Sequence, residues 1–201
     1  MSRSFGLILA CGPMFCGKSS ELIRRLRRAV IAKQKVVAFK HAADERYSED
    51  DEVVTHTRET FPSIKVTSVT QMDEHIKEDT DVIGIDEAQF FGAEIIQKVE
   101  EWADQGKQVI AAGLDQDYRG KPFGPIPFLL ARADKIIKLN AVCMVCGGEA
   151  TKTFLYPNFF NTEPDNQSEG GPVIIGSTEK YEARCRSCWN KGYKDVDLST
   201  K

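Results

Sequence analysis

Short apolar runs recur along the first 140 residues, and polar stretches separate them. The first run, Phe5–Cys11, has no polar interruption, which is typical of a strand buried on both faces of a parallel sheet. We expect this run to form the central strand. Four later runs are also predicted strands: Val36–Phe39, Val82–Ile85, Val109–Ala112 and Ile136–Leu139.

A helical period follows the first apolar run. Between Lys18 and about Ala32, the apolar residues recur at helical spacing and four arginines fall mainly on the opposite side. The apolar set is Leu22, Ile23, Leu26 and Val30, and the basic set is Arg24, Arg25, Arg27 and Arg28. A second helix is predicted within Ala93–Gln105. Because strands alternate with helices, the pattern predicts an α/β fold, a parallel sheet with helices on both faces.

Two polar stretches interrupt this pattern. Asp44–Pro62 includes the acidic cluster Glu49–Glu52, and we interpret it as a solvated loop. Tyr156–Pro172 is rich in turn-forming residues and predicts a long loop, which in a compact domain is usually functional or disordered. The length of 201 residues fits one ordinary domain with a small appendage.

Charge and the N-terminal segment restrict the classes of function. The chain has 27 basic and 30 acidic residues and a formal net charge of -3, with no long basic block, so composition does not support binding to a polynucleotide. The apolar run that ends at Cys11 is too short to span a bilayer and precedes no small-residue cleavage site. We therefore expect a cytoplasmic protein that contacts neither nucleic acid nor membrane.

A phosphate-binding motif lies between the first predicted strand and the first predicted helix. Its residues are Gly12, Pro13, Met14, Phe15, Cys16, Gly17, Lys18 and Ser19, which match G-x-x-x-x-G-K-[ST]. In this motif the glycines let backbone N–H groups face the phosphates, the lysine reaches the β and γ groups, and the serine hydroxyl binds Mg²⁺. The sequence thus predicts binding of a nucleoside triphosphate with magnesium. Cys11 and Cys16 are interpreted as packed, unreactive thiols.

Two carboxylates end the predicted strand Val82–Ile85. Asp86 is the expected magnesium partner, through a water molecule, and Glu87 would stand near the γ-phosphate, where a carboxylate can accept a proton from the attacking oxygen. This pattern alone leaves open whether that oxygen belongs to water or to a substrate hydroxyl.

Four of the six cysteines form two Cys-x-x-Cys pairs, Cys143 with Cys146 and Cys185 with Cys188. The spacing offers four thiolates to a tetrahedral Zn²⁺, and a site with four thiolates has no open position for catalysis. The 38 residues between the pairs exceed the usual spacing, so we expect a structural zinc ribbon enlarged by the turn-rich loop. A redox-active pair is the competing interpretation, although neither pair lies in a thioredoxin-like context.

These motifs together resemble the thymidine kinases of the human cytosolic and bacterial type. The similarity runs from the phosphate-binding motif through Asp86–Phe91 and Lys121–Gly124 to both cysteine pairs and Glu179–Tyr181. It implies a P-loop, RecA-like domain in residues 1–140, a zinc-binding subdomain with a lasso-like loop in 141–194, and a disordered tail in 195–201. It also implies transfer of the γ-phosphoryl group of ATP to the 5′-hydroxyl of thymidine, and of deoxyuridine, with Glu87 as the base.

The resemblance further implies roles for individual residues and for partners. Asp44, Arg46 and Gln89 would lie at the ATP and magnesium site, and Phe90, Tyr118 and Met14 would contact the base of the nucleoside. The residues expected to close over the nucleoside are Pro172, Val173, Ile174, Ile175, Gly176 and Tyr181. The family resemblance also implies a homotetramer that thymidine triphosphate inhibits.

Two other classes of function fit the same core motifs. In a nucleic-acid-remodelling ATPase, Glu87 would activate water and the zinc ribbon would grip a polynucleotide, but the acidic net charge argues against this alternative. In a zinc-stabilised interaction module, the phosphate-binding motif would act as a nucleotide switch without turnover. Thymidine-dependent production of ADP separates the kinase from both.

Overall fold

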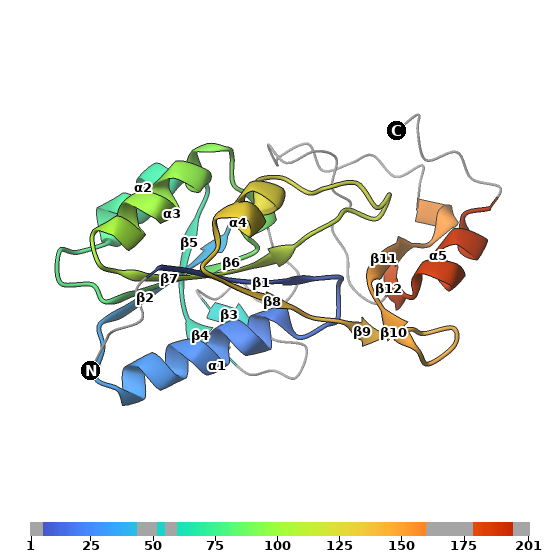
Figure 1. The fold of residues 1–201 in the computed structure, drawn as a ribbon, viewed down its shortest axis with the longest axis horizontal. Coiled ribbons are helices and arrows are strands. Elements are labelled where there is room, and N and C mark those ends of the chain that lie inside the picture. Colours follow the sequence, from blue (N-terminus) through green and yellow to red (C-terminus); the bar gives the residue numbers. More distant parts are fainter. Residues whose placement is uncertain (1–5, 44–51, 55–59, 160–178, 195–201) are drawn as a thin grey trace.

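The computed structural model describes residues 6–43, 52–54, 60–159 and 179–194 (Figure 1). Its largest element is a six-stranded sheet with the order β5-β2-β6-β7-β1-β8, in which every neighbouring pair is parallel. The strands are β1 (Gly6–Gly12), β2 (Val36–His41), β5 (Ile64–Val66), β6 (Val82–Asp86), β7 (Gln108–Leu114) and β8 (Lys135–Lys138). The predicted α/β class is confirmed.

The first strand is not the central one, so that expectation was wrong. β1 lies between β7 and β8, one place from the edge of the sheet, and β6 and β7 occupy the middle. A continuous apolar run indicates that both faces of a strand are buried, and the helices on the two faces of the sheet bury β1 although it is not central. Leu9 and Ala10 of β1 are fully buried, whereas Ile136 of the edge strand β8 is 48% exposed.

Helices cover both faces of the sheet (Figure 1). The helix α1 (Lys18–Ile31) packs on one face, where Leu22, Leu26 and Ala29 meet β1 and β7. The opposite face carries three helices, namely α2 (Val69–His75), α3 (Glu94–Asp104) and α4 (Ile126–Arg132). The helical period of α1 was misjudged at its end, because Val30 is 52% exposed and Ala29 takes the buried position one residue earlier.

A short hairpin lies within the stretch that we expected to be a solvated loop. Residues Glu52–Val54 (β3) pair antiparallel with Thr60–Pro62 (β4). Phe61 of β4 packs against the core beneath α1, which gives the second strand an apolar anchor. The interpretation as loop was therefore wrong for these two segments.

The C-terminal part forms a small unit that we call the cysteine ribbon, and Figure 1 shows it beyond the carboxyl ends of the strands. It contains two antiparallel pairs and one helix: β9 (Ala141–Val142) with β10 (Glu149–Ala150), β11 (Lys152–Leu155) with β12 (Tyr181–Arg184), and α5 (Arg186–Gly192). Two single-turn 3-10 helices, η1 (Ala88–Phe90) and η2 (Pro157–Phe159), complete the elements of the described residues. The expected division at residue 140 and the disordered tail stay predictions.

Candidate active site

The phosphate loop, residues 12–19, leads from the end of β1 into α1. Gly12 has a φ of 147°, and a Cβ there would lie 2.2 Å from the carbonyl oxygen of Leu139, so only glycine fits. Gly17 has a φ of 86°, and its missing Cβ would meet nothing within 4 Å. The space beside Gly17 is thus open at the point where backbone N–H groups of the loop would face phosphates.

The N-terminus of α1 lies at this open space. Gly17 is the N-cap and no side chain caps the helix, so the N–H groups of the first turn keep their capacity for an anion. The Lys18 ammonium donates to the Pro13 carbonyl oxygen at 2.7 Å and lies 3.8 Å from the Cys16 sulfur. The loop therefore presents a cation and helix-end N–H groups together, which is the chemistry that a polyphosphate requires.

The Ser19 hydroxyl and the Asp86 carboxylate meet across α1 and β6. Ser19 donates to Asp86 Oδ1 at 3.2 Å, and Asp86 is 4% exposed. A hydroxyl that donates to a carboxylate keeps its oxygen lone pairs for a metal, and the second carboxylate oxygen can hold a metal-bound water. The two side chains offer hard oxygen donors, so this pair fits a magnesium ion that Ser19 would contact directly and Asp86 through a water molecule.

Glu87 has an unusual backbone conformation directly after Asp86. Its φ of 53° and ψ of 41° lie in the left-handed region, which residues other than glycine, asparagine and aspartate rarely adopt. The Gln89 amide nitrogen donates to Glu87 Oε2, and Gln89 Oε1 accepts from the Leu114 N–H at 3.0 Å. Gln89 is fully buried, so its amide fixes the Glu87 carboxylate to the end of β7. Strain of this kind concentrates at functional sites.

The two cysteines near the phosphate loop are protonated at neutral pH. Burial, reinforced by the negative charge of Asp115, raises the pKa of Cys11 to about 11. Burial also raises the pKa of Cys16, although the adjacent Lys18 opposes the shift. Cys16 thus has a cationic neighbour that we did not expect from the sequence. Burial still keeps the Cys16 side chain in its thiol form.

Three of the residues predicted to contact the nucleoside, namely Met14, Tyr118 and Tyr181, gather between the phosphate loop and the cysteine ribbon. Met14 and Tyr181 are buried together with Leu155, and the half-buried Tyr118 packs against them. We call these four residues and their neighbours the aromatic cluster; the neighbours are Phe15, Leu114 and Phe159. Tyr118 reaches the cluster from the loop after β7, where Asp117 accepts the N–H groups of Arg119 and Lys121, both at 2.9 Å.

The structure separates Phe90 from the aromatic cluster and leaves several other predictions untested. Phe90 packs edge-on against Phe123, with ring centroids 5.8 Å apart, and also contacts His41. It follows Gln89 in η1, so it lies near Glu87 in the chain. The remaining candidates lie outside the described residues: Asp44, Arg46, Pro172, Val173, Ile174, Ile175 and Gly176.

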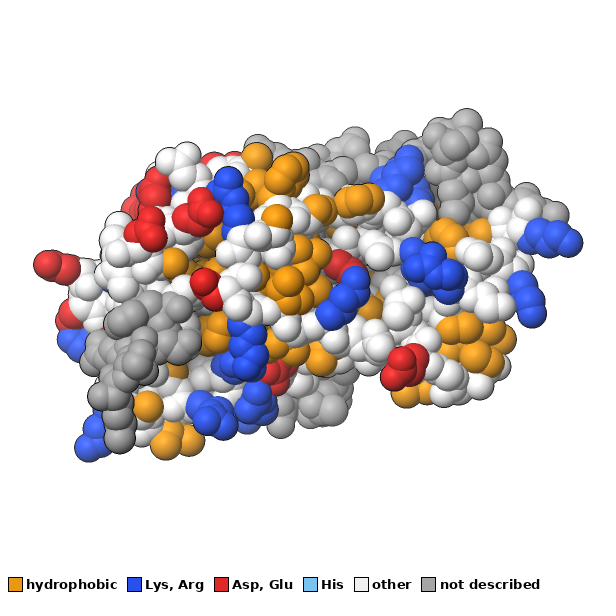
Figure 2. Space-filling model, in the orientation of Figure 1, with side chains coloured by type: hydrophobic (Ala, Val, Ile, Leu, Met, Phe, Trp, Pro, Cys, Tyr) orange, Lys and Arg blue, Asp and Glu red, His pale blue; other side chains and the backbone are white. Residues whose placement is uncertain are grey.

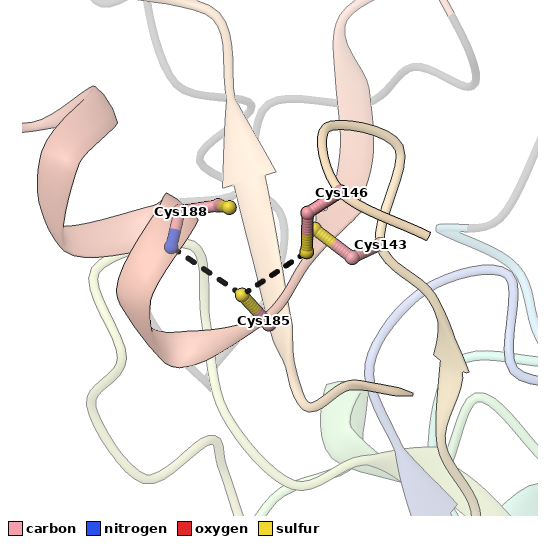
Figure 3. A group of neighbouring side chains, drawn as sticks. All are labelled: Cys143, Cys146, Cys185 and Cys188. Carbon is pink, nitrogen blue, oxygen red and sulfur yellow. Dashed lines mark hydrogen bonds between the residues drawn. The ribbon is translucent and has the colours of Figure 1, made fainter. Parts of the chain in front are cut away.

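The four paired cysteines converge at one point of the ribbon (Figure 3). All four sulfur atoms lie within 4.8 Å of one another, and Cys146 Sγ is 3.8 Å from Cys185 Sγ. Zn–S bonds of about 2.3 Å give tetrahedral sulfur–sulfur edges of about 3.8 Å, so the donor set fits zinc. Burial opposes ionisation of Cys143, yet hydrogen bonds from the backbone N–H groups of the two Cys-x-x-Cys turns lower its pKa to about 6.

The ribbon touches the phosphate loop directly, which sequence reasoning missed. The Met14 N–H donates to the Thr153 hydroxyl of β11 at 3.0 Å, across 139 positions of the chain. Phe15 and Cys16 also pack against the small core around Cys143. A threonine in a short strand carries no local sign of such a contact, so only the fold could reveal it.

On the face shown in Figure 2, basic side chains lie in separate groups rather than along one continuous track. Among the described residues, no helix combines the length and apolarity that crossing a membrane requires.

Comparison with known families identifies the relationship. A family model described as thymidine kinase matches residues 6–189, which is most of the chain and includes the phosphate loop, Glu87 and all four paired cysteines. The match does not favour a nucleic-acid-remodelling ATPase. The chain therefore belongs to the thymidine kinase family, whose function is the phosphorylation of thymidine.

Proposed function

We propose that this thymidine kinase uses ATP as its donor and that Glu87 is the base which accepts the proton of the 5′-hydroxyl. The observation that carries this proposal is the hydrogen bond from Ser19 to Asp86, together with the left-handed conformation of Glu87, the next residue in the chain. In this proposal the phosphate loop, the pair that would bind magnesium and the Glu87 carboxylate would face the same space. Phosphoryl transfer depends chiefly on positioning and charge neutralisation, which these groups can supply.

Different side chains would bind the phosphates, bind magnesium and accept the proton. Lys18 and the N–H groups at the start of α1 would hold the β and γ phosphates, while Ser19 and Asp86 would hold magnesium. The metal would neutralise charge that develops on the phosphate oxygens. Glu87, held by Gln89, would receive the proton as the nucleoside oxygen attacks. Asp44 and Arg46 are further proposed contacts near the phosphates.

The nucleoside would lie against the aromatic cluster. Met14, Tyr118 and Tyr181 line this region from the phosphate loop, the loop after β7 and β12. Phe90 and residues 172–176 are proposed to complete the enclosure and to exclude water, which would reduce hydrolysis of ATP. Deoxyuridine would also be a substrate, since one methyl group changes binding by only about 1–3 kcal/mol.

The cysteine cluster would hold a structural zinc rather than a catalytic one, because all four ligands are thiolates. Its contact with Phe15 supports a role in holding the ribbon against the phosphate loop. A homotetrameric assembly, inhibition by thymidine triphosphate and a cytoplasmic location are proposed from the family relationship.

A nucleoside panel tests the proposal. The purified chain is incubated with ATP labelled in the γ-phosphate, Mg²⁺ and one nucleoside at a time, and the labelled monophosphate is measured. We expect label on thymidine and deoxyuridine, with ADP formed in equal amount and no product without Mg²⁺. ADP production that needs no nucleoside, or that only DNA stimulates, would contradict the proposal. If another nucleoside triphosphate gives labelled monophosphate and ATP does not, ATP is not the donor.

A further inference from the structure

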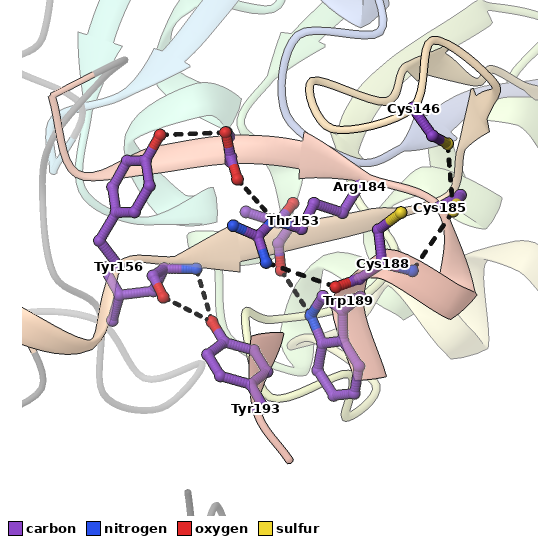
Figure 4. Close-up of polar contacts among 10 residues, drawn as sticks. Cys146, Thr153, Tyr156, Arg184, Cys185, Cys188, Trp189 and Tyr193 are labelled. Atoms are coloured by element: carbon purple, nitrogen blue, oxygen red, sulfur yellow. Dashed lines mark hydrogen bonds and ion pairs between the residues drawn. The ribbon is translucent and has the colours of Figure 1, made fainter. Parts of the chain in front are cut away.

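Tyr193, at the end of α5, lies against β11 (Figure 4), and Leu155 of this strand belongs to the aromatic cluster. Tyr193, which follows α5, is 5% exposed, and its hydroxyl makes two hydrogen bonds to one residue of β11. The hydroxyl accepts from the Leu155 N–H at 2.6 Å and donates to the Leu155 carbonyl oxygen at 2.8 Å. Both backbone groups of Leu155 on this edge of β11 are therefore satisfied by a single side chain.

Leu155 links that contact to the predicted nucleoside site. It is fully buried, it pairs with Tyr181 across β11 and β12, and it packs with Met14 in the aromatic cluster. Because Leu155 is shielded from water, loss of the Tyr193 hydroxyl would leave a buried N–H and a buried carbonyl without a partner. The strand would have to shift to satisfy them, and the cluster wall would shift with it.

Tyr193 is itself held rigidly. Its ring stacks on Phe154 at 4.2 Å and 21° between planes, and Trp189 meets it edge-on at 4.9 Å. Trp189 Nε1 also donates to the Thr153 carbonyl oxygen at 3.0 Å, one residue away from the Phe154 ring. Trp189 lies in α5 and Tyr193 directly follows it; the N-cap of this helix is Cys185, whose sulfur accepts the Cys188 N–H at 3.4 Å. The cysteine cluster thus anchors one end of the element that fixes β11.

We propose that Tyr193 is a positioning residue for the nucleoside, acting through the backbone of Leu155 on the wall formed with Met14 and Tyr181. The inference rests on the proposed location of the nucleoside against the aromatic cluster. Tyr193 lies beyond the last residue of the family match, which ends at residue 189, so the family relationship does not assign it a role.

The test is Tyr193→Phe, which removes the hydroxyl and keeps the ring that stacks on Phe154. We expect the KM for thymidine to rise about tenfold, as loss of the partner of buried backbone groups implies. The KM for ATP, the kcat and the zinc content should change less than about twofold, because the phosphate loop and Glu87 lie outside this contact.

Tyr156→Phe is the matched control. It removes a tyrosine hydroxyl next to Leu155, but that hydroxyl binds Glu182 at 3.0 Å rather than the backbone of β11. The control should keep the wild-type KM for thymidine. An unchanged KM for thymidine in Tyr193→Phe would overturn the inference. Equal increases in the KM for ATP and the KM for thymidine would also overturn it, because they would indicate only a general loosening of the structure.

Tyr118→Ala separates failure of this inference from failure of the proposed site. Tyr118 reaches the aromatic cluster from a different element, so its removal should raise the KM for thymidine if the nucleoside lies there. A raised KM in Tyr118→Ala with no effect in Tyr193→Phe rejects the positioning role alone. If neither variant changes the KM, the nucleoside binds elsewhere and both proposals fall.

Discussion

The carboxyl edge of the six-stranded sheet and the cysteine ribbon both face the candidate active site, but they hold their side chains in different ways. The sheet lies between two large apolar cores, and it can therefore keep Glu87 in a left-handed conformation. The core at the centre of the ribbon has four small buried residues, Ala141, Cys143, Ala150 and Ala183. Small units of this kind usually depend on a metal or on cross-links for stability.

This difference indicates a division of roles between the two regions. Asp86 and Glu87, the groups proposed to hold an accurate geometry during the reaction, lie at the end of the deeply buried strand β6. The surface proposed for the nucleoside comes partly from β11 and β12, which pack against α5 beside the cysteine cluster. We therefore expect damage to the sheet edge to appear in kcat, and damage to the ribbon to appear in thymidine binding.

The largest effect is expected from Glu87→Gln, which keeps the shape of the side chain and removes its ability to accept a proton. We expect kcat to fall about 10²–10⁴-fold, with ATP binding close to wild type. Single-turnover measurement of phosphoryl transfer, together with calorimetric titration of ATP, checks both parts. Asp104→Asn at the far end of α3 is the control for loss of one carboxylate. Near-wild-type turnover in Glu87→Gln would remove this residue from the role of base.

The second effect comes from the ribbon, through Cys185→Ser. This variant should lose the zinc, lower the apparent Tm and reduce kcat/KM for thymidine at least about tenfold, because a four-thiolate site contributes folding free energy. Metal analysis, thermal unfolding and steady-state kinetics provide the measurements. Ser187→Ala, at an exposed position of the same turn, should match wild type. If ATP binding falls as much as thymidine binding, the two regions act as one unit and the division of roles is wrong.

Much of the sheet could be predicted from sequence, because its signals are local. The apolar runs and the glycine-rich turn predicted β1, α1, β6 and β7, and their bounds were correct to within two residues at each end. The rank of β1 in the sheet could not be predicted in this way, because strand order depends on contacts between distant segments. The position of Ala29 was missed because alanine is a weak marker of a buried helix face.

The ribbon shows the opposite balance. The spacing of its cysteines was enough to predict the cluster, since zinc ligands have strict geometry. Its contacts with the site were not predicted, because Met14 meets Thr153 across 139 positions and Leu155 meets Tyr193 across 38. Threonine and tyrosine occur at many positions without such a role, so no periodicity reveals the pairing.

A pair of glycine substitutions compares the packing of the two regions. A Cβ at Gly84 would lie 2.8 Å from a methyl carbon of Leu26, so Gly84→Ala should lower the free energy of unfolding by about 1–3 kcal/mol. A Cβ at Gly192 would lie 2.5 Å from the buried Phe154 ring, so Gly192→Ala should displace the end of α5 and raise the KM for thymidine.

Urea unfolding and steady-state kinetics of both variants provide the comparison. Gly148→Ala is the control, because its Cβ would make an ordinary contact of 3.5 Å with the Cys146 sulfur. A raised KM for thymidine in Gly84→Ala, with an unchanged KM in Gly192→Ala, would reverse the expected relation between the regions.

The smallest effect concerns the surface of α1, where Glu21 bonds Arg24 and Arg25, each at 2.7 Å. Hydrogen bonding to Arg24 is the main cause that lowers the pKa of Glu21 below its ordinary value of 4.5. Because the pKa of Glu21 is lower in the folded state, its interactions with the two arginines stabilise the fold fully above pH 4.5. This stabilisation is lost as the pH falls through the pKa of the folded state. Ion pairs three or four positions apart on a helix contribute about 0.2–0.5 kcal/mol each, so Glu21→Gln should cost no more than about 1 kcal/mol at pH 7. Urea unfolding of both proteins at neutral pH and again at acidic pH measures the difference, which should disappear in acid. A cost at neutral pH as large as that of Gly84→Ala would show that the sheet region depends on surface charge as much as on its core.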